Sequence, residues 1–271
     1  MILIVASTGD VAGMNIAQQI IDQHEFEKTK EAFHQNPVYS RKIKNREIKL
    51  VFVNEEIVNT QFITKFFTPQ LLVFISKHRS VSERPTLSVH TPGNLAEAEL
   101  GGIPRKVSVS PASALRNALL ELATTKEKMG LRYEVSYECT HHGPSLDVPT
   151  MFVELGSSMK QWRDQRAAKA VARAAIAAVS EQSRYTAVLG VGGPHYNAKF
   201  TRIALSTPTA FGHIIPKYAV SRVDIEMVKQ CMDRTLEKVE SVILDWKGIK
   251  GADKEGLMAM LNEVGIPIEK A

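Results

Sequence analysis

The sequence of 271 residues contains only two cysteines, Cys139 and Cys231, which lie far apart in the chain. So few cysteines exclude a disulfide framework and a zinc finger, and they favour a reducing compartment. The apolar run at the N-terminus is too short for a signal peptide and has no basic segment before it. No run approaches the roughly 18 apolar residues that span a bilayer. We therefore expect a soluble cytoplasmic protein with no membrane contact, and no protein partner is inferred.

Aromatic residues and excess charge are also scarce. Aromatic side chains make up only 7% of the chain, so small aliphatic residues must fill much of the core. Hydrophobic residues at 44% and charged residues at 23% are close to the globular average, which allows a substantial core. The formal net charge of +5 permits an anionic partner such as nucleic acid but does not require one. The GxSxG, HExxH and GxGxxG motifs are all missing.

What the sequence does contain is an alternation of apolar runs and amphipathic segments. Strands are predicted at residues 1–7, 47–54, 71–78, 86–90, 132–138, 150–158 and 186–196. Helices are predicted at residues 11–24, 55–67, 112–128, 159–180, 222–241 and 253–264. This order predicts an α/β fold with a mixed, largely parallel central sheet flanked by helices. Because no linker or repeat is visible, we expect one catalytic domain over residues 1–271, with long active-site loops at about 78–112 and 192–220.

Histidines gather where the predicted strands end. Six of the eight lie in or beside loops that follow strands: His78, His90, His141, His142, His195 and His213. Ligands of open α/β sheets bind outside the carboxyl ends of the strands. If these strands run parallel, the histidines meet along one rim. A single histidine on a loop is usually solvated or structural, but six of them at strand ends favour a functional site.

The adjacent pair His141 and His142 raises a question of chemistry. Neutral imidazole binds zinc, and it is also the natural general base near pH 7. Catalytic zinc takes three protein ligands and a water. Neighbouring residues of a strand point to opposite faces, so both rings reach one metal only if Gly143 and Pro144 bend the backbone. The carboxylates nearby that can complete the site or orient a ring are Glu138, Asp147 and Glu154.

Five motifs stand in order along the chain: HTPGN (90–94), ECTHHGP (138–144), VELGS (153–157), GVGGPHYNAKFT (190–201) and FGHIIPKYA (211–219). Together they resemble the archaeal and plant type of D-aminoacyl-tRNA deacylase, from the first predicted strand to about residue 220. The resemblance implies a phosphorylase/hydrolase-like fold related to that of peptidyl-tRNA hydrolase. It also implies a zinc-dependent hydrolase that cleaves the ester between a D-amino acid and the terminal ribose of tRNA, and so acts in proofreading.

The resemblance places six residues at the active centre. We expect catalytic roles for His141, His142, Glu154 and His195. Metal ligands are expected among His90, His141, His142 and His213. Basic residues of the predicted helix 159–180 and of the loop 192–220 are expected to hold the tRNA backbone. These are Arg163, Arg166, Lys169, Arg173, Lys199 and Lys217.

Two other hypotheses stay open. In the first, the protein is a metal-free esterase like peptidyl-tRNA hydrolase, and one histidine acts as the general base. In the second, it is a tRNA-binding protein without catalysis. The second is disfavoured because a binding module has little use for six histidines at strand ends, and because few aromatic residues are available in the loops for stacking on bases.

Overall fold

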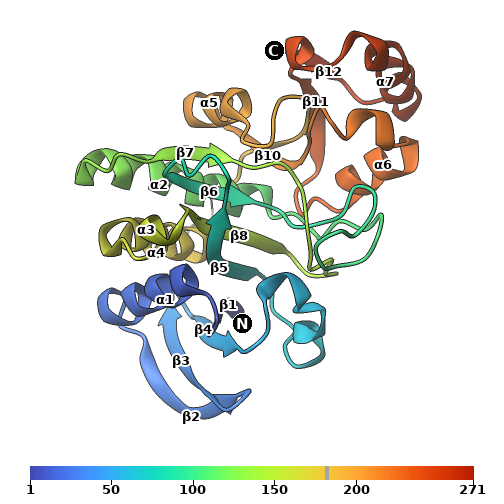
Figure 1. Cartoon of the computed structure of the whole chain (residues 1–271). Helices are drawn as coiled ribbons and strands as arrows, with labels where there is room; N and C mark the ends of the chain where they lie inside the picture. Colours follow the sequence, from blue (N-terminus) through green and yellow to red (C-terminus); the bar gives the residue numbers. More distant parts are fainter. Residues whose placement is uncertain (181–182) are drawn as a thin grey trace.

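The structure, a computed structural model, describes residues 1–180 and 183–271 and contains two β-sheets with helices packed against them (Figure 1). The larger sheet has eight strands in the order β2-β3-β4-β1-β5-β8-β6-β7. The smaller sheet has four strands in the order β10-β9-β11-β12. The predicted α/β class with a mixed, largely parallel sheet is confirmed.

The centre of the larger sheet is parallel and buried. Its strands are β1 (Ile2–Ser7), β4 (Arg46–Val53), β5 (Leu72–Arg79) and β8 (Thr150–Ser157), and these four pair in parallel with one another in the order β4-β1-β5-β8. Helices or loops cover both faces of these strands, which is why the sequence shows them as continuous apolar runs. At one edge lies the hairpin of β2 (Glu27–Phe33) and β3 (Asn36–Ile43). At the other edge, β6 (Thr86–His90) runs antiparallel to β8, and β7 (Glu134–Tyr137) follows β6 in parallel.

The helices against the larger sheet are α1 (Val11–Gln23), α2 (Ala112–Met129), α3 (Met159–Trp162) and α4 (Gln165–Ser180). The buried face of α4 consists mostly of alanine, so this helix packs closely against both α1 and α2. Short 3-10 helices, η1 (Ile57–Asn59) and η2 (Gln61–Lys65), occupy the segment between β4 and β5. Within the described residues, no helix combines the length and apolar character needed to cross a membrane.

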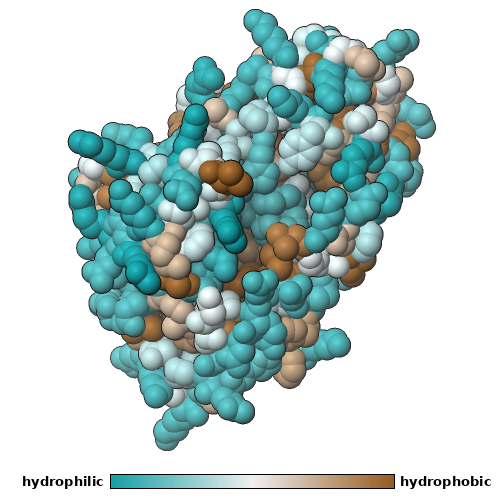
Figure 2. All heavy atoms as spheres, viewed as in Figure 1, coloured by the Kyte–Doolittle hydropathy of each residue, from teal (hydrophilic) through white to brown (hydrophobic). Residues whose placement is uncertain are grey.

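The smaller sheet is wholly parallel and has its own hydrophobic core. Its strands are β9 (Thr186–Val191), β10 (Thr209–Ile215), β11 (Val239–Leu244) and β12 (Ile268–Lys270). The helical segments here are α5 (Ala198–Ser206), η3 (Val220–Arg222), α6 (Ile225–Asp233), η4 (Trp246–Gly248) and α7 (Gly251–Val264). Figure 2 shows that the drawn face is hydrophilic over most of its area and hollowed near its middle.

Several sequence predictions of local structure are wrong. The predicted loop at 192–220 contains α5 and β10, and the predicted helix at 222–241 ends at Asp233 and gives way to β11. The predicted helix at 159–180 is interrupted after Trp162, because the Asp164 carboxylate accepts from the amides of Arg166 and Ala167 and starts a new helix. The β2–β3 hairpin gave no alternating pattern because β2 is mostly exposed. The helix expected at 55–67 is two 3-10 turns.

Candidate active site

A cavity of about 530 Å³ opens where β1 and β5 of the larger sheet end. Residues following these strands form one side, and the histidine-containing segments 141–142 and 195 form the other. The expectation of a single rim of parallel strand ends is only partly met. Glu154 lies inside β8, opposite Ser88 of the antiparallel strand β6, and His90 pairs with Phe152. The polar side chains therefore reach the cavity from opposite strand directions.

Three histidines form a compact group in this cavity. One ring nitrogen from each of His90, His141 and His142 lies within 4.8 Å of the others. The ring centroids of His141 and His142 are 4.3 Å apart. The backbone turns at His142 itself, whose φ of 41° is in the left-handed region, so adjacent residues send both rings to one place. The sequence motif could not specify this turn.

Hydrogen bonds fix the tautomers of the adjacent pair. Nδ1 of His141 donates to the carbonyl of Cys139 at 2.8 Å, and Nδ1 of His142 donates to the carbonyl of Gly143 at 2.7 Å. Both Nε2 atoms therefore keep a free lone pair when the rings are neutral. Burial and the neighbouring histidines lower the pKa of His141 well below its usual value, and burial lowers the pKa of His142 to about 4. Both rings are thus neutral at pH 7.

Two buried glutamates stand beside this group. Glu154 Oε1 accepts a 2.6 Å hydrogen bond from Ser76, and its Oε2 lies 3.5 Å from His78 Nδ1 and 3.6 Å from His90 Nε2. Glu138 Oε1 lies 3.3 Å from the same His78 nitrogen. Burial opposes ionisation of both carboxyl groups, but the histidines around them outweigh burial. The pKa of Glu138 is lowered and that of Glu154 lies well below its usual range.

His195 is held in a different protonation state. Its Nε2 donates to Glu138 Oε2 at 2.8 Å, and its Nδ1 lies 3.3 Å from both Cys139 Sγ and Tyr218 Oη. Burial alone lowers the pKa of His195, but the hydrogen bonds to Cys139 and Glu138 raise it to about 10. His195 is therefore an imidazolium at neutral pH. Its ring centroid is 4.4 Å from that of His141, so a positive charge borders the neutral group.

His213, a predicted metal ligand, lies elsewhere. It is fully buried on β10, where Nδ1 is 3.1 Å from Thr140 Oγ1 and Nε2 is 3.3 Å from the carbonyl of Arg234. Among the described residues it belongs to none of the three His/Cys/Asp/Glu groups that can hold a metal. The structure thus separates His213 from His90, His141 and His142, because the motif around it forms a strand of the smaller sheet and not a loop.

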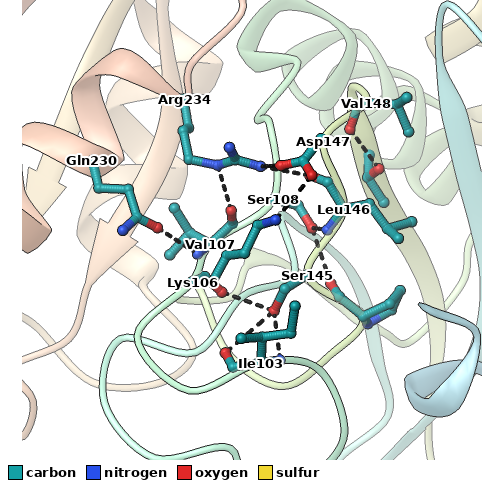
Figure 3. A network of polar contacts seen from close by, with 12 residues as sticks. Ile103, Lys106, Val107, Ser108, Ser145, Leu146, Asp147, Val148, Gln230 and Arg234 are labelled. Carbon is teal, nitrogen blue, oxygen red and sulfur yellow. Dashed lines mark hydrogen bonds and ion pairs between the residues drawn. The ribbon is translucent and has the colours of Figure 1, made fainter.

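Asp147 is also outside the site, and it has a structural role. Figure 3 shows its carboxylate between Lys106 and Arg234, at 2.9 Å and 2.7 Å. The same network joins Ser108 to the carbonyl of Pro144 and Ser145 to the carbonyl of Lys106. This network therefore holds in place the segment that follows the histidine pair.

The structure adds side chains that were not assigned to the site. His78 and Glu138 stood out in the sequence as a strand-end histidine and a nearby carboxylate, but nothing in the sequence ranked them with the others. Tyr196, whose hydroxyl contacts His78 Nε2, and Tyr218, whose hydroxyl lies 3.2 Å from Cys139 Sγ, lie within two of the quoted motifs but were not singled out from the sequence. Tyrosines are common in cores, so only their placement indicates a role.

Comparison with known proteins decides the family. The sequence model of D-aminoacyl-tRNA deacylase matches residues 65–269. A D-aminoacyl-tRNA deacylase of Pyrococcus abyssi is 36% identical over 279 residues, covering 99% of each protein. A deacylase of Methanosarcina acetivorans is 34% identical over 278 residues, covering 99% of this chain and 92% of the relative. This chain belongs to the D-aminoacyl-tRNA deacylase family.

The family similarity extends past the motifs visible in the sequence, which stop near residue 220, and includes the segment with β11, α7 and β12. A crystal structure of a conserved protein of unknown function has the same fold as this deacylase family member. Its TM-score is 0.88 at 28% identity, and the match covers 100% of this chain and 95% of the other. The smaller sheet is therefore part of the shared fold.

The basic residues predicted to hold tRNA fall into two sets in this deacylase family member. Arg166 donates to the carbonyl of Met129, Arg173 pairs with Glu121 at 2.8 Å, and Lys199 pairs with Asp245 at 2.6 Å. These three cations are thus partly engaged within the protein, and Lys169 is half-buried on α4. Arg163 and Lys217 are exposed. Arg163 follows Trp162, whose indole donates to the carbonyl of His78 at 2.9 Å.

The buried His213 gives a prediction about stability and pH. Its pKa is lowered by burial to about 4, whereas the unfolded chain takes up a proton near pH 6.5. The stability that this residue contributes is complete above pH 6.5 and is lost as the pH falls towards 4, by about 3 kcal/mol. Urea denaturation of the wild type and of His213→Leu between pH 7 and pH 4 measures this. We expect the free energy of unfolding to fall less steeply in the variant.

After the substitution, each of the two groups that contact the ring keeps one hydrogen bond. Thr140 Oγ1 still accepts from the amide of Ile214, and the carbonyl of Arg234 still accepts from the amide of Ser110. The other titrating groups are common to both proteins, so the difference in slope isolates His213. Parallel curves for the two proteins would contradict a neutral His213.

Proposed function

We propose that the histidine–glutamate cluster hydrolyses the ester bond of D-aminoacyl-tRNA with an activated water, releasing the D-amino acid and tRNA. Family membership supplies the substrate. The observation that carries the mechanism is the separation of protonation states: His141 and His142 are neutral, while His195 is charged. Ester hydrolysis by water needs no covalent nucleophile, and the chain has no GxSxG elbow.

The proposed cofactor is zinc, held by His90, His141 and His142. Three nitrogen ligands with a fourth position open to water are the usual arrangement of catalytic zinc. Both ring nitrogens of His90 are buried without a hydrogen-bond partner among the described residues, which is costly unless something binds them. The tautomers of His141 and His142 leave Nε2 available in the same place. When bound there, zinc would bring the pKa of a water to near 7.

The remaining side chains accept a proton or stabilise charge. Glu154 lies next to His90 and is ionised, so it accepts the proton of the attacking water; Ser76 orients it through the 2.6 Å hydrogen bond. His195, charged and hydrogen-bonded to Glu138, stabilises the negative charge that develops on the ester oxygen. His78 lies between the two glutamates and keeps both ionised.

The buried nitrogens of His90 argue against the metal-free alternative, because without a metal neither nitrogen has a hydrogen-bond partner among the described residues. The hypothesis of a tRNA-binding protein without catalysis is also disfavoured. A binding surface gains nothing from two ionised glutamates buried at 1% and 3% exposure, because burying charge is costly.

For tRNA binding we propose the exposed cations Arg163 and Lys217, together with Lys77 and Arg79 of the cavity wall. Such residues bind phosphates and give affinity that falls with salt. Arg166, Lys169, Arg173 and Lys199 contribute less, because most of them already contact protein groups. The proposal that residues 1–271 act as one catalytic domain is unchanged, with the active site formed next to both sheets.

The direct test of the function is deacylation of matched D- and L-aminoacyl-tRNA by the purified protein, with and without a chelator. We expect release of the D-amino acid to be much faster than that of the L form, and chelation to abolish it until zinc is restored. Equal rates for the two enantiomers would contradict the substrate. Full activity in protein shown by elemental analysis to be free of metal would contradict the zinc-dependent mechanism and leave the substrate assignment intact.

The proposed role of Glu154 is tested by Glu154→Gln, which keeps the shape of the side chain and removes the proton acceptor. We expect kcat to fall by about 10²- to 10⁴-fold, with KM little changed. The matched control is Glu121→Gln, which removes a carboxylate on α2 that pairs with Arg173 at the surface, and it should keep wild-type kcat. Thermal denaturation of both variants checks folding. A Glu154→Gln protein that is folded, contains zinc and turns over at the wild-type rate would exclude the role.

A further inference from the structure

Two cavities meet at the adjacent histidines. The larger, of about 530 Å³, and a second of about 240 Å³ share three lining residues: His141, His142 and Leu100. The second cavity is formed by the irregular segment 93–100 and by residues 216–222. A bond cleaved at the histidine pair therefore has room for one part of the substrate on each side.

The larger cavity suits an anionic, nucleoside-sized group. Its volume falls in the range of about 300–1,000 Å³ that holds drug-sized ligands. Lys77 and Arg79 line it, and neither forms an ion pair among the described residues. The carboxylate of Asp10 accepts from the backbone amides of Ala12, Gly13 and Lys77, which offset part of its charge. Glu56, exposed at the wall, is the other carboxylate that lines this cavity outside the histidine cluster, and it forms no ion pair among the described residues.

The smaller cavity has the opposite character. Its volume of about 240 Å³ is below the range for a nucleoside-sized ligand. Glu97 and Arg222 line it and pair with each other, so their charges cancel. Glu99 also lines the cavity, is exposed, and has no ion pair within the described chain. One uncompensated negative charge therefore stands in a small pocket next to His141 and His142.

Resting on the proposed function, we infer that the substrate lies across the histidine pair in one orientation. The terminal nucleotide of tRNA occupies the larger cavity, and the aminoacyl group occupies the smaller one. There the Glu99 carboxylate attracts the α-ammonium of the amino acid. The two halves of the substrate carry opposite charge, and the unpaired charges of the two cavities match them. The volumes of the two cavities and the charges that line them are independent observations, and both favour this orientation.

The test compares two substrates that differ only in the ammonium: a D-aminoacyl-tRNA and its N-acetyl derivative on the same tRNA. The variants are Glu99→Gln and, as the matched control, Glu56→Gln, which removes the unpaired carboxylate of the larger cavity. At pH 7 the α-amino group is mostly charged, since its usual pKa is about 7.7. The quantity measured is kcat/KM for the free-amine substrate divided by that for the N-acetyl substrate.

We expect Glu99→Gln to lower this ratio by about fivefold, the upper range for an exposed ion pair. Glu56→Gln should change kcat/KM for both substrates by the same factor and leave the ratio as in the wild type. If the ratio falls only in Glu56→Gln, the ammonium lies in the larger cavity, and the proposed orientation is wrong. An unchanged ratio in both variants would exclude Glu99 as the ammonium site. Failure of the wild type on both substrates would instead overturn the proposed function, so the two failures are distinguishable.

Discussion

The arrangement of the site depends on the burial of two ionised carboxylates, Glu138 and Glu154. Removing one partner from a buried ion pair typically costs about 3–5 kcal/mol, so each carboxylate must have its compensating groups in place. His78 lies within 3.5 Å of both, and the protonated His195 donates to Glu138. With the positive charge assigned to these two rings, His141 and His142 stay neutral. The buried carboxylates thereby divide the histidines into charged rings that pair with them and neutral rings.

The fold places the histidines and glutamates next to one another because it brings strands of opposite direction together. His78 and Ser76 come from β5, Glu154 from the middle of the adjacent strand β8, and His90 from antiparallel β6. Parallel strands alone would put all the strand ends at one rim and leave Glu154 below it. The segment after His142 is held from the side of the smaller sheet by Arg234, which bonds the carbonyls of Val107 and Leu146. The two sheets therefore cooperate in placing the histidine pair.

The sequence was informative where burial is continuous. The apolar runs predicted β1, β4, β5 and β8, and the histidines at predicted strand ends indicated that residues 138–144 belong to the site. It failed where a side chain's direction depends on distant elements. His213 and His78 are both histidines near strand ends, yet one is enclosed by Thr140 and Arg234 and the other faces two glutamates. The contacts of His213 with Thr140 and of His78 with Glu138 join residues 73 and 60 positions apart, and local patterns do not encode such contacts.

The measurement that tests this charge sorting most directly is heteronuclear NMR of the imidazole nitrogens in metal-free protein. We expect His195 to be still doubly protonated at pH 8, because its pKa is about 10. We expect His142, with a pKa of about 4, to be neutral at pH 6 and protonated only on Nδ1, and His141 to have the same tautomer. A neutral His195 at pH 8 together with a charged His141 or His142 at pH 6 would contradict this division of charge.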